Sequence, residues 1–82
     1  MQKLFVGVAI LRCRMIKYYL ICSSRCAAQE TYGALVEYLG ERVFIPDLSV
    51  SRQKVLALIG HMRRGRVTPA AVRDIVEDWL VR

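Results

Sequence analysis

The chain has 82 residues, of which 55% are hydrophobic and 24% are charged. A chain of this length supports one domain at most, because it buries only about 60% of the surface that its unfolded form exposes. The apolar content excludes an intrinsically disordered chain, which has few apolar residues and a high density of charge. We therefore expect one folded domain.

The net charge of +6 is distributed in blocks along the chain. Residues 1–29 and residues 48–66 each carry +5, whereas residues 30–47 carry −3 and the last sixteen residues carry −1. Basic blocks of this kind can attract nucleic acid or an acidic protein partner. The charge alone does not choose between these two classes of partner.

Three cysteines, Cys13, Cys22 and Cys26, lie in the first third of the chain. Their odd number leaves at least one thiol unpaired within a monomer, which argues against a disulfide scaffold. A zinc site would need all three thiols and the single histidine, His61, as its four ligands. We expect instead reduced thiols in a cytoplasmic protein, with no metal and no cofactor.

The first eleven residues resemble the start of a secretory signal, since a lysine precedes a run of apolar residues. Basic residues from Arg12 onward interrupt this run, and no stretch approaches the roughly 20 apolar residues that span a bilayer. We expect neither export nor a membrane contact. Residues 1–14 are interpreted as an accessory N-terminal segment, or as an extra strand, in front of a single domain over residues 15–82.

Three runs after Met15 have the composition of β-strands. Residues 16–22 and 31–39 are rich in aromatic and β-branched residues, and each run is followed by serine or glycine residues typical of turns. Residues 42–45 form a shorter run, and Pro46 marks an edge or an end because proline cannot donate to a ladder. We predict an antiparallel meander of two or three strands, which needs helices on one face to be stable.

The second half of the chain predicts two helices. Asp47 or Ser49 can cap the first helix, and Gly65 is placed to end it. Thr68 and Pro69 supply a cap and a first helical residue for the second helix. Apolar residues recur at helical spacing in both segments: Val55, Leu58, Ile59 and Met62, then Val72, Ile75, Val76, Trp79 and Leu80. The predicted fold class is therefore α+β, a small antiparallel sheet of two or three strands followed by two helices packed on one face.

Several short motifs resemble those of a family of short, uncharacterised bacterial proteins, a domain of unknown function. They are Lys17-Tyr18-Tyr19-Leu20, Thr31-Tyr32-Gly33, Ile45-Pro46-Asp47-Leu48-Ser49, and the closing segment from Thr68-Pro69 to Val76-Glu77-Asp78-Trp79-Leu80. The family shows YYL, TYG and VVEDFL-like motifs, and the resemblance covers about residues 15–81. This chain departs from the family pattern in its cysteine-rich first turn and its more basic first helix. The family brings no known activity, so the resemblance supports the fold only.

Catalytic patterns are weak in this sequence. His61, the only candidate base for a Ser or Cys nucleophile, is a lone histidine in a predicted helix, and such a histidine is most often a surface or boundary residue. Asp74 lies three and four residues from two other carboxylates, a spacing typical of a solvated helix face. A glycine-rich phosphate loop is absent. We expect no enzyme activity.

Arginines near the end of the first predicted helix are the most suggestive feature. Arg63, Arg64 and Arg66 could hold phosphates, with Arg52 and Lys54 at the other end of the same helix. The alternative is that these cations complement the helix dipole. A helix-turn-helix is rejected, because its second helix would be acidic outside and would repel DNA.

The tyrosines, which include Tyr18 and Tyr19, outnumber those that so small a core can bury, and Tyr and Arg are enriched in interface hot spots. The leading hypothesis is therefore a small non-enzymatic protein-interaction or regulatory module, with a phage-type inhibitor of a host system as one class of this size. The alternative is a nucleic-acid-binding protein that uses the basic end of the first helix. A spare edge strand would also allow a homodimer.

Overall fold

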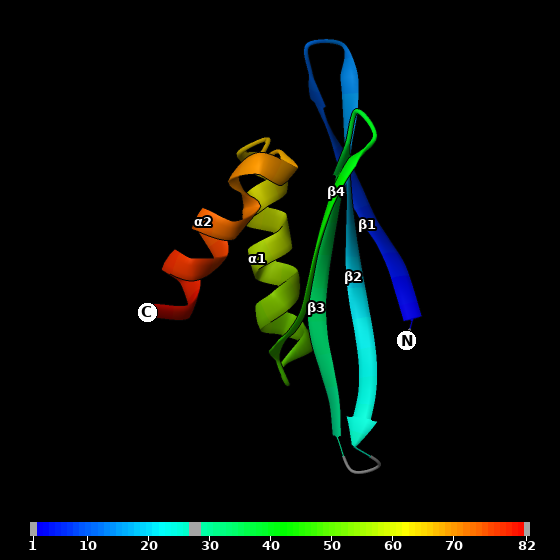
Figure 1. Cartoon of the computed structure of the whole chain (residues 1–82), viewed down its shortest axis with the longest axis vertical. Helices are drawn as coiled ribbons and strands as arrows, with labels where there is room; N and C mark the ends of the chain where they lie inside the picture. The colour runs from blue at the N-terminus through cyan, green and yellow to red at the C-terminus, as the bar shows by residue number, and fades with distance from the viewer. Residues whose placement is uncertain (1, 27–28, 82) are drawn as a thin grey trace.

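The computed structural model describes residues 2–26 and 29–81. Four strands are followed by two helices: β1 (Gln2–Leu11), β2 (Arg14–Cys26), β3 (Gln29–Tyr38), β4 (Glu41–Ser49), α1 (Arg52–Arg64) and α2 (Pro69–Val81). The strands form one antiparallel sheet in the order β1-β2-β3-β4, and both helices lie against the same face of it (Figure 1). The predicted α+β class is confirmed, but the sheet has four strands, not two or three.

The additional strand is β1, which sequence analysis set apart as an accessory segment or an extra strand. It pairs with β2 from Gln2 opposite Cys22 to Leu11 opposite Arg14, with one irregularity between Phe5 and Gly7. Composition alone does not distinguish this strand from the apolar segment of a secretory signal. The pairing of β1 with β2 does.

The last strand is longer than the predicted run of residues 42–45. β4 continues through Pro46 to Ser49, and its pairing with β3 shifts where Gly33 approaches it. A Cβ atom on Gly33 would lie 2.2 Å from the carbonyl oxygen of Ile45, so only glycine fits here. Pro46 is tolerated because β4 is an edge strand.

Two tight turns join the outer pairs of strands. Arg12 and Cys13 have φ angles of 51° and 64°, and Leu39 and Gly40 have φ angles of 51° and 79°. Two-residue hairpins of the type I′ class need positive φ at both positions, which matches the right-handed twist of the strands. Only Gly40 adopts this conformation without a steric cost.

The helices begin and end close to the predicted residues. Ser51 caps α1, accepting a hydrogen bond from the backbone N–H of Lys54, so the predicted caps Asp47 and Ser49 were wrong. Both still lie in β4, because the chain turns toward the helix only after Ser49. Gly65 ends α1 and Pro69 begins α2, as the sequence predicts.

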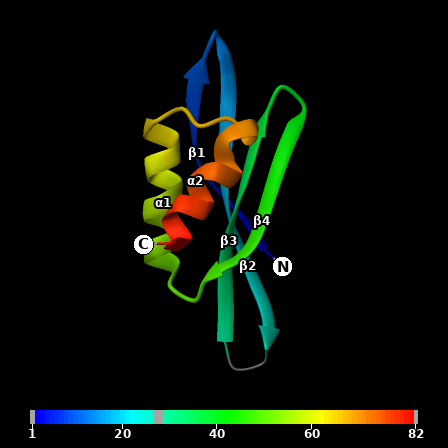
Figure 2. The same cartoon turned by 60° about the vertical axis from the view of Figure 1, so that its left-hand side comes forward.

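The hydrophobic core fills the space between the helices and the sheet. α1 contacts all four strands, whereas α2 contacts β3 and β4 (Figure 2). The residues buried between the two layers are Ala9, Ile16, Tyr18, Leu20, Cys22, Ala34, Val36, Val55, Leu58, Ile59, Met62, Val72 and Val76. The predicted core stripe of α1 is fully buried, whereas Trp79 of α2 is half-buried and Leu80 is exposed.

Candidate interaction surface

Within the described residues, no helix lies against the second face of the sheet, here called the open face (Figure 1). Side chains alternate between the two faces of a strand, and residues directly opposite each other in neighbouring strands share a face. The pairing therefore assigns the following residues to the open face: Lys3, Phe5, Val8, Ile10, Met15, Lys17, Tyr19, Ile21, Leu35, Glu37, Arg42 and Phe44.

An apolar row crosses the middle of the open face. Phe5, Tyr19, Leu35 and Phe44 stand directly opposite one another on β1, β2, β3 and β4. Phe5 and Tyr19 make an edge-to-face contact with ring centroids 5.6 Å apart. Phe5 is 60% exposed and Phe44 is 40% exposed. Large apolar side chains of all four strands thus form one line, which is exposed at its two edges and nearly covered at Leu35.

A shallow hollow of about 360 Å³ lies beside this row. Ile21 and Leu35, on the two central strands, form its floor, and only 3% and 6% of their surface is exposed. Lys3 on one edge strand and Phe44 on the other also line it. The hollow therefore combines an apolar floor with a cationic rim.

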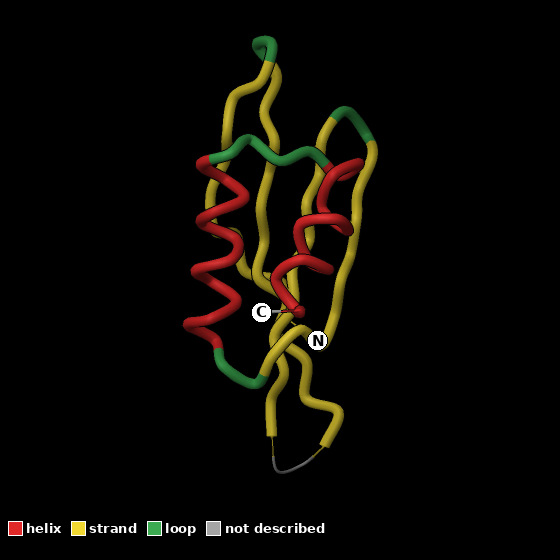
Figure 3. The backbone as a smooth tube through the Cα atoms, turned by 90° about the vertical axis from the view of Figure 1, so that its left-hand side faces the viewer, coloured by secondary structure: helices red, strands yellow, loops and turns green. Residues whose placement is uncertain are grey.

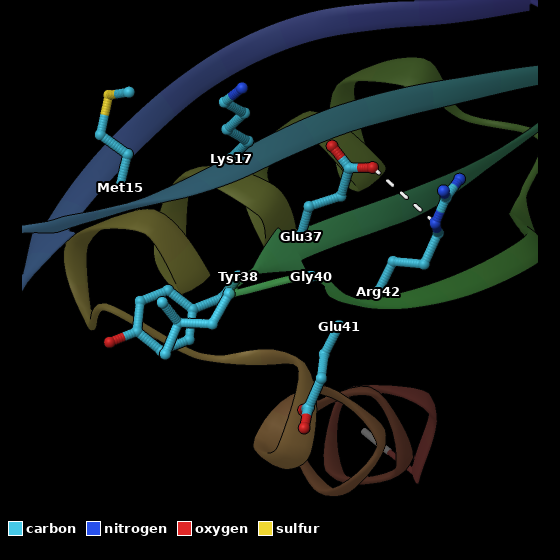
Figure 4. Close-up of a pocket in the computed structure, with 8 residues that line it drawn as sticks. Met15, Lys17, Glu37, Tyr38, Gly40, Glu41 and Arg42 are labelled. Atoms are coloured by element: carbon cyan, nitrogen blue, oxygen red, sulfur yellow. Dashed lines mark ion pairs between the residues drawn. The ribbon is translucent and has the colours of Figure 1, made fainter.

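Charged side chains stand next to the apolar row. Lys17, Glu37 and Arg42 occupy directly opposite positions on β2, β3 and β4, and Figure 4 shows Glu37 between the two cations. The Arg42 Nε atom lies 4.0 Å from Glu37 Oε2, and the Arg42 side chain is 70% exposed. On the other side of the row, Lys3 Nζ lies 4.7 Å from the centre of the Tyr19 ring.

The two neighbouring tyrosines predicted as binding residues lie on opposite faces. Tyr18 is fully buried under α1, and its hydroxyl donates to the carbonyl oxygen of Val67 at 2.8 Å, with that of Met62 at 3.3 Å. Burial raises the pKa of Tyr18 to about 12, against a smaller opposing effect of Arg63. Tyr18 therefore has no surface to offer a partner.

Tyr19 lies on the open face and is half-buried. Partial burial raises the pKa of its hydroxyl, and the charge of Glu37 and a hydrogen bond to it raise it further. Tyr19 is thus the predicted binding tyrosine that the structure places on an accessible surface, and it connects the apolar row to the charged residues beside it.

The predicted basic residues lie in the helix layer, away from the open face. Arg52 and Lys54 are exposed at the start of α1, while Arg63 and Arg64 are exposed at its end, about 14 to 18 Å away at 1.5 Å per residue. Arg66 follows, also exposed. The predicted binding residues therefore do not form one site.

Two further arginines lie toward the same end of the molecule as the end of α1. Arg12 and Arg14 are exposed at the β1–β2 hairpin, which projects on the side of the α1–α2 connection (Figure 3). A Cβ atom on Gly7 would lie 2.9 Å from Arg63 Cδ, so the Arg63 side chain runs across β1. We call Arg12, Arg14, Arg63, Arg64 and Arg66 the basic end.

The cysteines are separated within the described residues. Cys13 is exposed in the first turn, and Cys22 is buried in the core. The side chain of Cys26 lies outside the described part of the chain. No group of three or more His, Cys, Asp or Glu side chains that could hold a metal ion occurs among the described residues. No described helix is long and apolar enough to cross a membrane.

The open face was not among the surfaces predicted from the sequence, although the sequence contains a signal for it. The run from Ile16 to Cys22 is apolar at nearly every position, so both faces of β2 are apolar. An antiparallel strand with one solvated face normally alternates between apolar and polar residues. The continuous run therefore indicated an apolar second face, which two helices on one side leave uncovered.

The fold and its surfaces define a small α+β domain with one covered and one open sheet face. A family model matches residues 11–82, and the chain belongs to that family, DUF6514, a family of unknown function. The match begins at the last residue of β1 and includes the other strands and both helices. The predicted membership in an uncharacterised family is confirmed. No curated protein and no solved structure matches the chain.

Proposed function

We propose that this protein is a small non-enzymatic interaction module, regulatory in role, that contacts a protein partner through the open face. The observation that carries the proposal is the apolar row. Phe5 and Phe44 expose much of their surface, and they flank a centre where Ile21 and Leu35 are already almost covered. Contiguous exposed apolar surface with a polar rim is typical of protein interfaces.

The residue types of the open face support the same function. Aromatic residues and arginine are enriched where binding energy concentrates, and the open face offers Phe5, Tyr19, Phe44 and Arg42. Ordered strands already hold these side chains, so binding would cost little conformational entropy. The apolar row is bordered by Lys3, Lys17 and Arg42, an arrangement that resembles the apolar core and polar rim of a protein interface.

Photo-crosslinking in the native cell tests this proposal. Benzoylphenylalanine at Phe44 should give discrete protein adducts, because the partner would cover this residue. The same group at Gln53, which is exposed on α1, is the matched control and should give none of them. Identical adduct patterns from both positions, or no adduct from position 44, would contradict the proposal.

Nucleic-acid binding is a second candidate, and the basic end is the observation that favours it. Five exposed arginines from β1–β2 and the end of α1 lie toward one end of the molecule. Replacing Arg63, Arg64 and Arg66 with Gln tests it by the dependence of affinity on salt. If they contact phosphates of duplex DNA, the log–log slope should fall by about 0.9 per lost contact. Binding that is weak at physiological salt, and equal in the variant, would exclude this function.

A further inference from the structure

We infer that the partner seated on the open face is a second copy of this chain, packed sheet against sheet. This inference rests on the proposed function and specifies its partner. It follows from the order of the residues on the open face, which is complementary to itself about one particular axis.

A two-fold axis that relates two stacked sheets must lie in the plane between them, and each contact must then occur twice. An axis along the strands, between β2 and β3, places β2 of one copy over β3 of the other. Each row of side chains then meets the same row of the second copy. Sheets packed in this way are about 10 Å apart and rotated by about 30°, so the alignment holds best for the two central strands.

This axis pairs opposite charges. Lys17 on β2 would face Glu37 of the second copy on β3, and the reciprocal pair would form on the other side of the axis. Glu37 can accept this second cation, because its ion pair with Arg42 is long, at 4.0 Å, and its side chain remains 27% exposed. The contact between copies therefore repeats a pairing of charges that already occurs between strands of one copy.

The same axis pairs the apolar row with itself. Tyr19 would pack over Leu35 of the second copy, and Phe5 would approach Phe44 at the edges of the sheets. An axis perpendicular to the strands, through the apolar row, would instead place Lys17 over Ile21 and Glu37 over Gly33, so neither charge would face an opposite charge. The charge pattern thus selects the first arrangement.

The open face is large enough for such an interface. Four strands about 4.8 Å apart, each with about nine residues at 3.3 Å, present roughly 600 Å² per copy and roughly 1,200 Å² for the pair. This area is at the lower end of specific interfaces. We expect a reversible dimer that forms and dissociates with concentration.

Charge reversal tests the arrangement, with molecular mass measured by sedimentation up to millimolar concentration. The wild-type chain should dimerise, and Lys17→Glu and Glu37→Lys should each weaken self-association more than tenfold, because like charges would then meet twice. An equimolar mixture of the two variants should associate again, because one chain offers two acidic positions and the other offers two basic positions. Loss of the ion pair between Glu37 and Arg42 in Glu37→Lys cannot produce this recovery.

Matched controls on the helix layer are Lys54→Glu and Glu77→Lys, which make the same charge changes at exposed positions. Both should dimerise like the wild type, and circular dichroism should show all variants folded. A wild-type chain that stays monomeric at every concentration would overturn the inference, as would dimers that ignore both reversals.

The crosslinking experiment at Phe44 distinguishes the proposed function, a protein interface on the open face, from the further inference that the partner is a second copy. Adducts with a different protein, together with a wild-type chain that stays monomeric, would support the open face as a protein interface. They would contradict the inference that its partner is a second copy. Adducts with twice the mass of the chain support the inference. Absence of any protein adduct would reject both, and nucleic-acid adducts would assign the face to the other class of partner.

Discussion

The two faces of the sheet carry similar residues in different surroundings. On the covered face, Tyr18 and Leu20 are 0% and 1% exposed because α1 packs on them. On the open face, Phe5 and Phe44 stay 60% and 40% exposed beside a nearly covered Leu35. The covered face forms the core with the helices, whereas the open face keeps large apolar side chains at its edges exposed. Alternate residues of β2 therefore belong to two different surfaces, the core under the helices and the open face.

Removal of β1 should have the largest effect on the covered face. A shortened chain that starts at Met15 loses Leu4, Val6, Ala9 and Leu11, which all belong to or pack against the core. We expect it to lose its cooperative thermal unfolding transition, measured by circular dichroism. An unchanged transition would show that β1 is accessory, as one interpretation of the sequence held.

Two leucines on the central strands offer a matched comparison between the faces. Leu20→Ala should lower the free energy of unfolding by about 3 kcal/mol, because it leaves a cavity under the helices. Leu35→Ala should cost roughly half as much, because its exposed neighbours can move in to fill the space. Urea unfolding at low protein concentration measures both values. Equal losses would mean that the open face is a second core of the monomer.

The sequence predicted the helices better than the sheet, for a physical reason. Gly65 ends α1 and Pro69 begins α2 through local backbone preferences, which can be predicted from the sequence alone. The pairing of β1 reaches partners as far as Cys22 for Gln2, and the place of Tyr18 under α1 depends on Val67, which is 49 residues away in sequence. Tyr18 and Tyr19 were both predicted as binding residues, and the structure places them on opposite faces because neighbours on a strand point to opposite sides. The basic residues of α1 were predicted as candidates for phosphate binding, and only the fold shows that they lie away from the open face.

Replacing Tyr18 or Tyr19 with Phe should have a smaller effect on the free energy of unfolding, and the effect at Tyr18 should depend on pH. Tyr18→Phe should cost about 1 kcal/mol near neutral pH, because the Val67 carbonyl oxygen loses its donor. Tyr19→Phe should cost less, because its hydroxyl lies at a partly solvated face.

The sign of the pH effect follows from the pKa of Tyr18, which burial raises to about 12 in the folded state from 10.0 when unfolded. The unfolded chain therefore loses this proton first, and the stability that the neutral hydroxyl provides declines as pH rises from 10 toward 12. The advantage of wild type over Tyr18→Phe should shrink over this range in urea unfolding. A constant difference would contradict the assigned burial of the hydroxyl.

The first turn should give the smallest effect. Arg12 and Cys13 both adopt positive φ, which suits Asn and Gly better than the residues present. Arg12→Asn combined with Cys13→Gly should raise the free energy of unfolding by about 1 kcal/mol. The thermal midpoint measures this gain, and it should leave self-association unchanged because the turn lies outside the central rows. A loss of stability would show that the turn has another geometry.

The most direct test of the difference between the two faces is a dilution series followed by amide NMR. We expect the amide signals of Lys17, Tyr19, Leu35 and Glu37 to shift as the protein is diluted, while those at the end of α1 stay constant. Shifts confined to the basic end, or spectra that do not change with concentration, would contradict the claim that the open face is where two copies meet.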